Sequence, residues 1–280
     1  MGRLLPDRRP LEDGCVFARW QDLTSPRLGQ VAGADAIAVL PVAAVEQHGP
    51  HLPLGTDLLI CEGYLARLAP LVPDALAVLT LPIQAVGKSD EHLSFPGTLS
   101  LTPEAALAAW LEIGACVAAA GIRRLVILNT HGGNVPVMDL LARKLRARYG
   151  MLAVMASMHR FGYPPGLFAD DERAHGIHGG EIETSLMLAF RPDLVDMGQA
   201  ADFSPFSRDM EARFAHLRAN HPIGFGWMSE DLHPSGAMGD ARGATAAKGE
   251  AAADFGAAAF AALLEDVAAF DLGHFARSEG

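Results

Sequence analysis

Short runs of consecutive apolar residues alternate along the chain with longer segments in which apolar residues recur at helical spacing. Four runs have the length of buried strands, over residues 35–42, 77–82, 124–129 and 151–156. A strand that is apolar on both faces is typical of a parallel sheet covered by helices on each side. The pattern predicts an α/β fold, a three-layer α/β/α sandwich with a mostly parallel central sheet.

The segments between these runs are predicted to be helices, and one of them carries a full set of helix-start signals. Thr102 can cap this helix, Pro103 suits its first position, and Glu104 places an acid in its first turn. The helix should run to about Ala120 and stop at Gly121. Further helices are expected over residues 57–69, 134–149, 181–190 and 244–267.

The 280 residues are enough for one large α/β domain, and no repeat or low-complexity linker divides them. We therefore expect a single domain over residues 1–280. Residues 1–30 show no clear period and are expected to form an irregular N-terminal extension. Residues 200–235 are rich in loop-forming positions and predict a lid or a subunit contact.

The charge and cysteine content indicate which binding partners and which cellular compartment to expect. The net charge of −11 argues against nucleic acid or an anionic membrane as partner. The three cysteines form no CxxC pair, which is typical of thiols in a reducing compartment. No apolar run reaches the roughly 20 residues that span a bilayer, and the N-terminus lacks the apolar core of a signal peptide. We expect a cytoplasmic protein.

The segment over residues 41–57 concentrates carboxylates and imidazoles just after the first predicted strand. Glu46 and His48 are one residue apart and point the same way in an extended segment. Asp57 follows at a helix start, where the helix dipole alone would favour a carboxylate. Buried charges persist only when paired or coordinated, so a metal site is predicted. His51 is expected to hydrogen-bond a ligand rather than to be one.

Two further polar clusters come at later strand and helix ends. His131 follows the strand over residues 124–129, and two glycines after it let the backbone approach a ligand. A tight turn with a structural histidine is the alternative. Farther on, His178 precedes a predicted helix whose first turn holds Glu181 and Glu183. These acids face about 200° apart on a helix, so only one can reach the site, and either could be an ordinary first-turn acid.

The loop over residues 87–98 is too polar for a core. Its Ser89, His92 and Thr98 could bind polar groups of a substrate, although a capped surface loop would look the same. Because the carboxyl ends of parallel strands share one edge of a sheet, this loop should lie beside the other clusters.

The donor set of the metal site contains nitrogen and oxygen but no sulfur: Glu46, His48, Asp57 and His131. Such a set suits Zn²⁺, Mn²⁺ or Fe²⁺ and not a structural zinc held by thiolates. Several carboxylates exceed what one catalytic zinc uses. Two divalent metal ions that share one carboxylate are therefore expected, and such a pair can activate a hydroxide nucleophile.

Five motifs together resemble the creatininase (creatinine amidohydrolase) family, in order over about residues 35–250: EQHGPHLPLGTD, SDEHLSFPGTLSL, NTHGGN, HGGEIETSLML and GAMGDARGATAAKGE. The resemblance implies a three-layer α/β/α sandwich and a homohexamer. It also implies a binuclear Zn or Mn centre that hydrolyses the C–N bond of an amide, often a cyclic one.

Carried over by position, Glu46 and His48 would bind different ions, Asp57 would bridge them, and His131 would complete one of them. Creatininase itself has a glutamate ligand two residues after the histidine of its third motif, where this chain has Gly133. We expect Glu183 to replace that ligand, with Glu181 as the alternative. The resemblance also implies that His178 transfers protons.

The leading hypothesis is a metal-dependent hydrolase of a small-molecule amide, with a cyclic, creatinine-like substrate. The tryptophans that enclose creatinine have no counterpart in the loop HRFGYPPGLF that begins at His159. A formamide or short-peptide hydrolase with the same site is one alternative. The other, from a different class, is a non-catalytic subunit of an assembly that metals stabilise.

Overall fold

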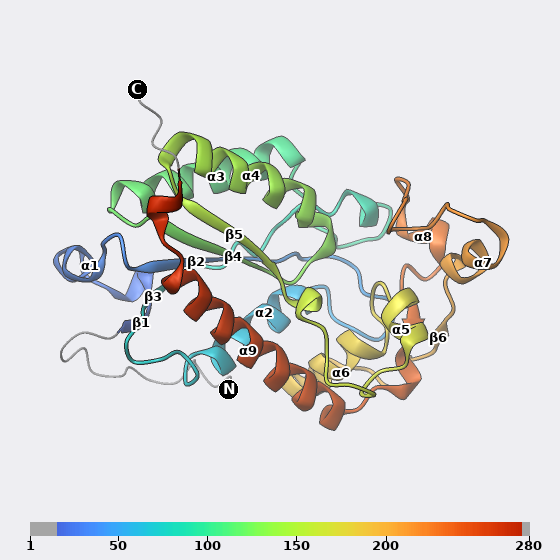
Figure 1. Ribbon diagram of the computed structural model, residues 1–280. Helices are drawn as coiled ribbons and strands as arrows, with labels where there is room; N and C mark the ends of the chain where they lie inside the picture. Colours follow the sequence, from blue (N-terminus) through green and yellow to red (C-terminus); the bar gives the residue numbers. More distant parts are fainter. Residues whose placement is uncertain (1–15, 276–280) are drawn as a thin grey trace.

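A sheet of five parallel strands forms the centre of the computed structural model, which describes residues 16–275 (Figure 1). The spatial order is β1-β3-β2-β4-β5. Their bounds are β1 Val16–Arg19, β2 Ile37–Val42, β3 Ala77–Thr80, β4 Arg124–Asn129 and β5 Leu152–Ser157. β2 lies in the middle, where Val39 pairs with Val126 of β4 on one side and Thr80 of β3 on the other.

Helices cover both faces of this sheet (Figure 1). One face carries α3 (Pro103–Ala119) and α4 (Val135–Tyr149). The other carries α2 (Thr56–Leu68), α6 (Glu181–Phe190) and α9 (Ala246–Ala269). Alternate residues of β2 point into two separate hydrophobic cores. Ile37 and Val39 pack in the core beneath α2 and α9, and Ala38 and Leu40 pack in the core beneath α3 and α4. The predicted α/β/α sandwich is thereby confirmed.

The major helices begin where their caps indicate. The Thr102 hydroxyl accepts a hydrogen bond from the Ala105 amide at 3.2 Å, and Pro103 occupies the first position of α3. The Thr245 hydroxyl does the same for the Lys248 amide at the start of α9, also at 3.2 Å. These hydroxyls satisfy amides that have no partner within the helix.

The expected irregular extension is wrong for its described part. Residues 16–19 form the edge strand β1, and α1 (Ser25–Val31) follows. β1 has only four residues, too few to show a period, and its pairing with β3 is a tertiary contact that the sequence does not display. Residues 1–15 lie outside the described part of the chain.

Residues 200–235 are mainly loops and turns with two short helices, α7 (Phe206–Arg213) and α8 (Ser229–Leu232). Beside them, β6 (Asp202–Phe203) and β7 (Gly239–Asp240) form an antiparallel pair, and α5 (Asp170–His175) precedes α6. A lid or subunit contact here stays a prediction. Between residues 16 and 275, no helix is both long and apolar enough to cross a membrane.

Arg124 fastens the C-terminal end of α9 to the start of β4. Its side chain is buried and donates to the carbonyl of Val267 at 3.0 Å and to that of Phe270 at 3.2 Å. It also donates to the carbonyl of Ala34, just before β2. The last carbonyls of a helix lack partners within it, so this guanidinium stabilises the helix end and joins three segments.

Candidate functional site

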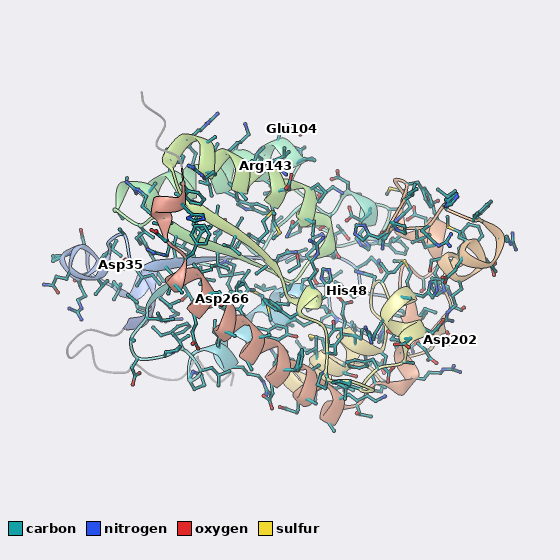
Figure 2. All side chains as sticks on the ribbon, viewed as in Figure 1. Asp35, His48, Glu104, Arg143, Asp202 and Asp266 are labelled. Carbon is teal, nitrogen blue, oxygen red and sulfur yellow. The ribbon has the colours of Figure 1, made fainter. Side chains whose placement is uncertain are left out.

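The polar clusters meet beyond the carboxyl ends of the central strands, where Figure 2 places His48. Glu46 and His48 lie in the segment between β2 and α2, and Asp57 lies in the first turn of α2. His131 lies two residues after the end of β4, and Glu183 lies in the first turn of α6. Segments far apart in sequence thus bring all five expected ligands together.

Three overlapping groups among the described residues could hold a metal ion, and within each group the ligand atoms lie within 4.8 Å of one another. The groups are Glu46–Asp57–His131, His48–Asp57–Glu183 and Glu46–His48–His178. The first two groups have only Asp57 in common. This arrangement fits two cations that share one carboxylate.

The Asp57 carboxylate presents a different oxygen to each half of the cluster. Its Oδ2 lies 3.4 Å from His131 Nδ1, and that nitrogen lies 3.2 Å from Glu46 Oε1. Its Oδ1 lies 3.7 Å from His48 Nε2, which in turn lies 3.8 Å from Glu183 Oε2. Asp57 can therefore contact a cation on either side without a change of rotamer.

Backbone carbonyls fix the tautomers of both expected imidazole ligands. His48 Nδ1 donates to the carbonyl of Glu46 at 3.1 Å, and His131 Nε2 donates to the carbonyl of Lys88 at 2.7 Å. Because a carbonyl only accepts, the hydrogen of each neutral ring is on that nitrogen. The other ring nitrogen keeps its lone pair and faces the carboxylates, as a metal ligand must.

Several buried polar atoms of the cluster have no hydrogen-bond partner: both carboxylate oxygens of Glu46, Oδ2 of Asp57 and Nε2 of His48. An unpaired buried carboxylate is costly, since it has lost its hydration without a replacement. Divalent cations would satisfy these atoms, and the mixture of carboxylate and imidazole suits zinc or manganese. The residues therefore fit a metal centre.

The pKa values show how strongly the cluster attracts positive charge. Burial lowers the pKa of His48, but the carboxylates of Asp57, Glu183 and Glu46 raise it more, to about 9. Burial raises the pKa of Glu183 to about 7, although His48 acts to lower it. The field that holds protons here would also hold metal ions, because both are cations that interact with the same carboxylates.

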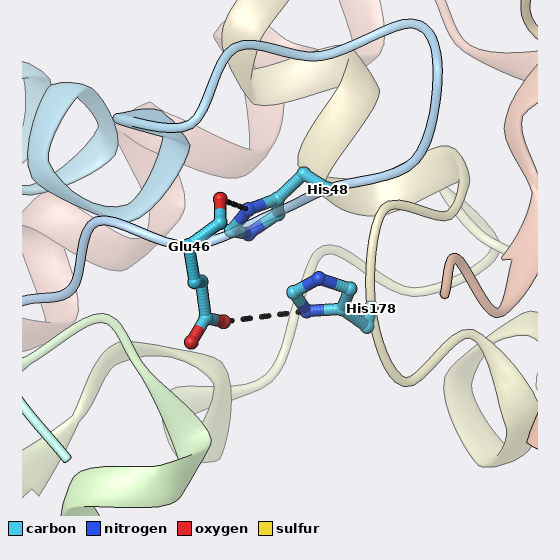
Figure 3. Close-up of side chains that lie close together, drawn as sticks. All are labelled: Glu46, His48 and His178. Atoms are coloured by element: carbon cyan, nitrogen blue, oxygen red, sulfur yellow. Dashed lines mark hydrogen bonds and ion pairs between the residues drawn. The ribbon is translucent and has the colours of Figure 1, made fainter. Parts of the chain in front are cut away.

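His178, the expected proton-transfer residue, lies against the ligands (Figure 3). Its Nε2 donates to the carbonyl of Gln47 at 2.5 Å, and its Nδ1 faces Glu46 Oε1 at 3.6 Å. The ring packs on His48 and His92 at centroid distances of 4.0 and 4.2 Å. Burial, reinforced by the charge of His48, holds the pKa of His178 well below its usual value, so the ring is neutral and its Nδ1 carries a lone pair.

The two acids of α6 point in different directions, as their spacing predicts. Glu183 joins the cluster, where its Oε2 accepts a hydrogen bond from the Gly179 amide at 2.6 Å. Glu181 instead pairs with Lys248 of α9. The structure therefore places Glu183, and not Glu181, beside Asp57 and His48.

The expected substrate-binding residues occupy three different positions. The Ser89 hydroxyl is buried 3.4 Å from His131 Nε2, and His92 Nε2 lies 3.4 Å from Glu46 Oε1. The Thr98 hydroxyl accepts a hydrogen bond from the Gln47 amide at 3.2 Å and so supports the backbone between the ligands.

The expectation for His51 is wrong. Its Nε2 hydrogen-bonds the Thr184 hydroxyl at 2.9 Å, and the structure shows no hydrogen bond from it to an expected ligand. The ring stacks on Phe203 instead, at a centroid distance of 5.3 Å. His51 therefore links α6 to the β6 segment through Thr184 and Phe203.

The space beside Gly133, two residues after His131, explains why this position holds a glycine. A Cβ atom there would lie 2.3 Å from Glu91 Oε1, 2.4 Å from His131 Nε2 and 2.5 Å from the Lys88 carbonyl. The hydrogen bond that orients His131 thus occupies the room that a side chain would need. Glu91, which lies 3.9 Å from His131 Nε2 and pairs with Lys88 Nζ at 2.5 Å, was missed by the sequence analysis.

A parallel sheet with buried carboxylates and imidazoles at its carboxyl edge defines an α/β protein with a candidate binuclear metal centre. The family model described as creatinine amidohydrolase matches residues 21–264. The chain therefore belongs to the creatininase family and is a metal-dependent hydrolase of that family. This confirms the resemblance found in the sequence.

Relatives within the family carry different activities in their names. The creatinine amidohydrolase of Pseudomonas putida is 34% identical over 196 residues, which cover 63% of this chain and 72% of that protein. The mycofactocin precursor peptide peptidase of Mycobacterium ulcerans (strain Agy99) is 34% identical over 194 residues, which cover 66% and 72%. Identity thus does not separate a cyclic amide from a peptide as substrate.

Solved structures of creatininase share the fold. A crystal structure of creatinine amidohydrolase superimposes with a TM-score of 0.69 at 28% identity, covering 89% of this chain and 96% of that one. A structure described as creatininase Mn gives a TM-score of 0.69 at 28% identity, with 89% and 97% covered. A mutant creatininase described as Zn-Zn type gives 0.68 at 27% identity, again with 89% and 97% covered.

Proposed function

We propose that this protein hydrolyses the C–N bond of a small-molecule amide, with a cyclic, creatinine-like amide as the leading substrate class. The observation that carries this proposal is the buried cluster in which oxygens of Glu46 and Asp57 have no hydrogen-bond partner. Likeness to creatinine amidohydrolase supports the choice of bond.

Two divalent ions would be held by separate halves of the cluster, with zinc or manganese preferred and iron also compatible with the donors. Glu46, Asp57 and His131 form one half, and His48, Asp57 and Glu183 form the other. When bound, such ions supply Lewis-acid polarisation of a carbonyl and lower the pKa of a water molecule toward neutrality.

His178 is the residue that we assign to proton transfer. Its Nε2 is anchored on the Gln47 carbonyl, so only Nδ1 is free to take or give a proton. That nitrogen faces the cluster, 3.6 Å from Glu46 Oε1, where a leaving nitrogen must be protonated. A positioned acid of this kind is worth typically about 10²–10⁴ in rate. His92 and Ser89 lie beside the same cluster and would bind polar atoms of the substrate.

A short peptide is the second candidate substrate. The mycofactocin precursor peptide peptidase is as similar in sequence to this chain as the creatinine amidohydrolase is. The loop over residues 159–168 contains no tryptophan with which to enclose a small ring, a feature that agrees with a larger substrate. A formamide hydrolase would use the same site.

The experiment is a metal analysis of protein purified without chelator, followed by assays on creatinine, a formamide and short peptides. We expect about two ions per chain and hydrolysis of one substrate class that chelator abolishes. Tightly bound metal without turnover of any class would instead favour the non-catalytic assembly subunit. We also propose a homo-oligomer, a hexamer by family likeness, in a cytoplasmic location; light scattering of the purified protein would test the oligomer.

A further inference from the structure

Gln47, the residue between Glu46 and His48, is buried and fully hydrogen-bonded although no motif assigns it chemistry. Its backbone amide donates to the Thr98 hydroxyl at 3.2 Å, and its carbonyl accepts from His178 Nε2 at 2.5 Å. Its side chain reaches a different set of partners. Gln47 therefore contacts both His178, through its carbonyl, and His92, through its side chain.

The orientation of the Gln47 amide is fixed by two backbone groups. The Gly49 amide, which only donates, lies 2.9 Å from Oε1, and the Gly236 carbonyl, which only accepts, lies 2.9 Å from Nε2. A flipped amide would place two acceptors together at Gly236 and two donors together at Gly49. The assignment of oxygen and nitrogen in this side chain is thus unambiguous.

This orientation determines the tautomer of His92. Gln47 Nε2 lies 2.7 Å from His92 Nδ1 and has one hydrogen left to donate, so Nδ1 must accept. The neutral ring then carries its hydrogen on Nε2, which faces Glu46 Oε1 at 3.4 Å. The neutral rings of His48 and His131 are opposite in this respect, since each carries its hydrogen on the nitrogen that donates to a backbone carbonyl and directs the other nitrogen at the carboxylates.

We propose that Gln47 is a positioning residue that keeps His92 as an N–H donor in the site and prevents it from becoming a further metal ligand. The N–H of His92 would then bind oxygen, either that of Glu46 or, on the basis of the proposed hydrolase function, that of the amide substrate. The His92 ring also stacks on His178, with ring centroids 4.2 Å apart, so a fixed His92 ring supports the position of the proton-transfer residue.

The direct test is ¹⁵N solid-state NMR of histidine-labelled, zinc-loaded protein, with the His92 signals identified by their absence from a His92→Phe variant. We expect a protonated Nε2 and an unprotonated Nδ1 for His92. A protonated Nδ1, or a zinc-bound Nε2, would overturn the proposal. This measurement needs no substrate, so its outcome is independent of whether amide hydrolysis is found.

Variants test the role of the side chain. Gln47→Met removes the donor, and the His92 hydrogen should then be shared between the two ring nitrogens. Gln47→Glu replaces the donor by an acceptor and should move the hydrogen to Nδ1. Gln84→Met is the matched control, because the side-chain amide of Gln84 donates to the Pro82 carbonyl and to no residue of the cluster. His92 spectra unchanged in both Gln47 variants would contradict the assignment.

Turnover supplies the second readout once a substrate is known. Gln47→Met should lower kcat about tenfold, the effect expected for one oriented hydrogen bond. If Gln47 acts through His92, the same substitution should have no further effect in the His92→Phe background. Additive losses in this double-mutant cycle would show that Gln47 acts independently and would overturn the positioning role.

Discussion

Neutralising Asp57 should weaken binding at both halves of the metal centre at once. Asp57 is common to the groups Glu46–Asp57–His131 and His48–Asp57–Glu183, and each of its oxygens faces one of them. Asp57→Asn keeps the size of the side chain but removes its charge. We therefore expect both ions to bind more weakly, whereas Glu183→Gln should weaken only one.

The magnitude follows from the spacing of the ligand atoms, which lie within 4.8 Å of one another. At that separation, one pair of unit charges is worth about 3 kcal/mol at an effective dielectric constant of about 20. Affinity should therefore fall about 100-fold or more. For a single site with zinc at about 1,000 times the wild-type Kd, the stabilisation by zinc would drop from about 4 to about 1.4 kcal/mol.

The assay is thermal unfolding with and without zinc, combined with the zinc content after gel filtration. The wild-type Tm should rise by roughly 10 °C with zinc, and that of Asp57→Asn by roughly 4 °C. Asp266→Asn, an exposed acid on α9, is the matched control and should behave like the wild type. An Asp57→Asn protein that keeps two zinc ions per chain and the full thermal shift would refute the shared-carboxylate interpretation.

Three other outcomes can be measured on the same protein. His178→Ala should keep its zinc and lose about 10²–10⁴ in turnover, measured by steady-state kinetics; equal loss of metal would make His178 a ligand. In the metal-free protein the pKa of His48 is raised to about 9, so zinc must displace a proton below that pH. Apparent zinc affinity should rise about tenfold per pH unit from 7 toward 9 in chelator-competition titrations, and a flat profile would contradict this. Arg124→Met removes the donors to the end of α9 and should lower the free energy of unfolding, measured by urea denaturation, by about 2–4 kcal/mol. The exposed Arg143→Met should leave it unchanged, and equal effects of the two substitutions would contradict the role of Arg124 at the helix end.

The sequence was sufficient for the sheet and its helices because the strong apolar runs are bounded by polar residues. β2 and β4 lie within or at the expected bounds, and α3 begins at its Pro103 as its cap predicts. β1 was missed because four residues carry too little pattern, and its place beside β3 depends on a contact between distant segments. Short elements defined by tertiary packing have no local signature.

The same distinction holds for the candidate site. Glu46, His48 and Asp57 lie within one short segment, so a shared metal site could be predicted from the sequence alone. The choice of Glu183 over Glu181 needed the family resemblance. The structure then showed Glu181 paired with Lys248. The role proposed for Gln47 could not be predicted from the sequence. It depends on hydrogen bonds to His92 and Gly236, which only the fold brings close to its side chain.

The edge strand β1 matters to anyone who shortens this chain. Its four residues run in register along β3, from Val16 beside Ala77 to Arg19 beside Thr80. Removing them would bare the backbone donors and acceptors of β3, and an open strand edge is a template for pairing with a second molecule. Residues 16–19 thus satisfy the backbone groups along one side of β3, and truncated variants should begin upstream of them to keep that pairing.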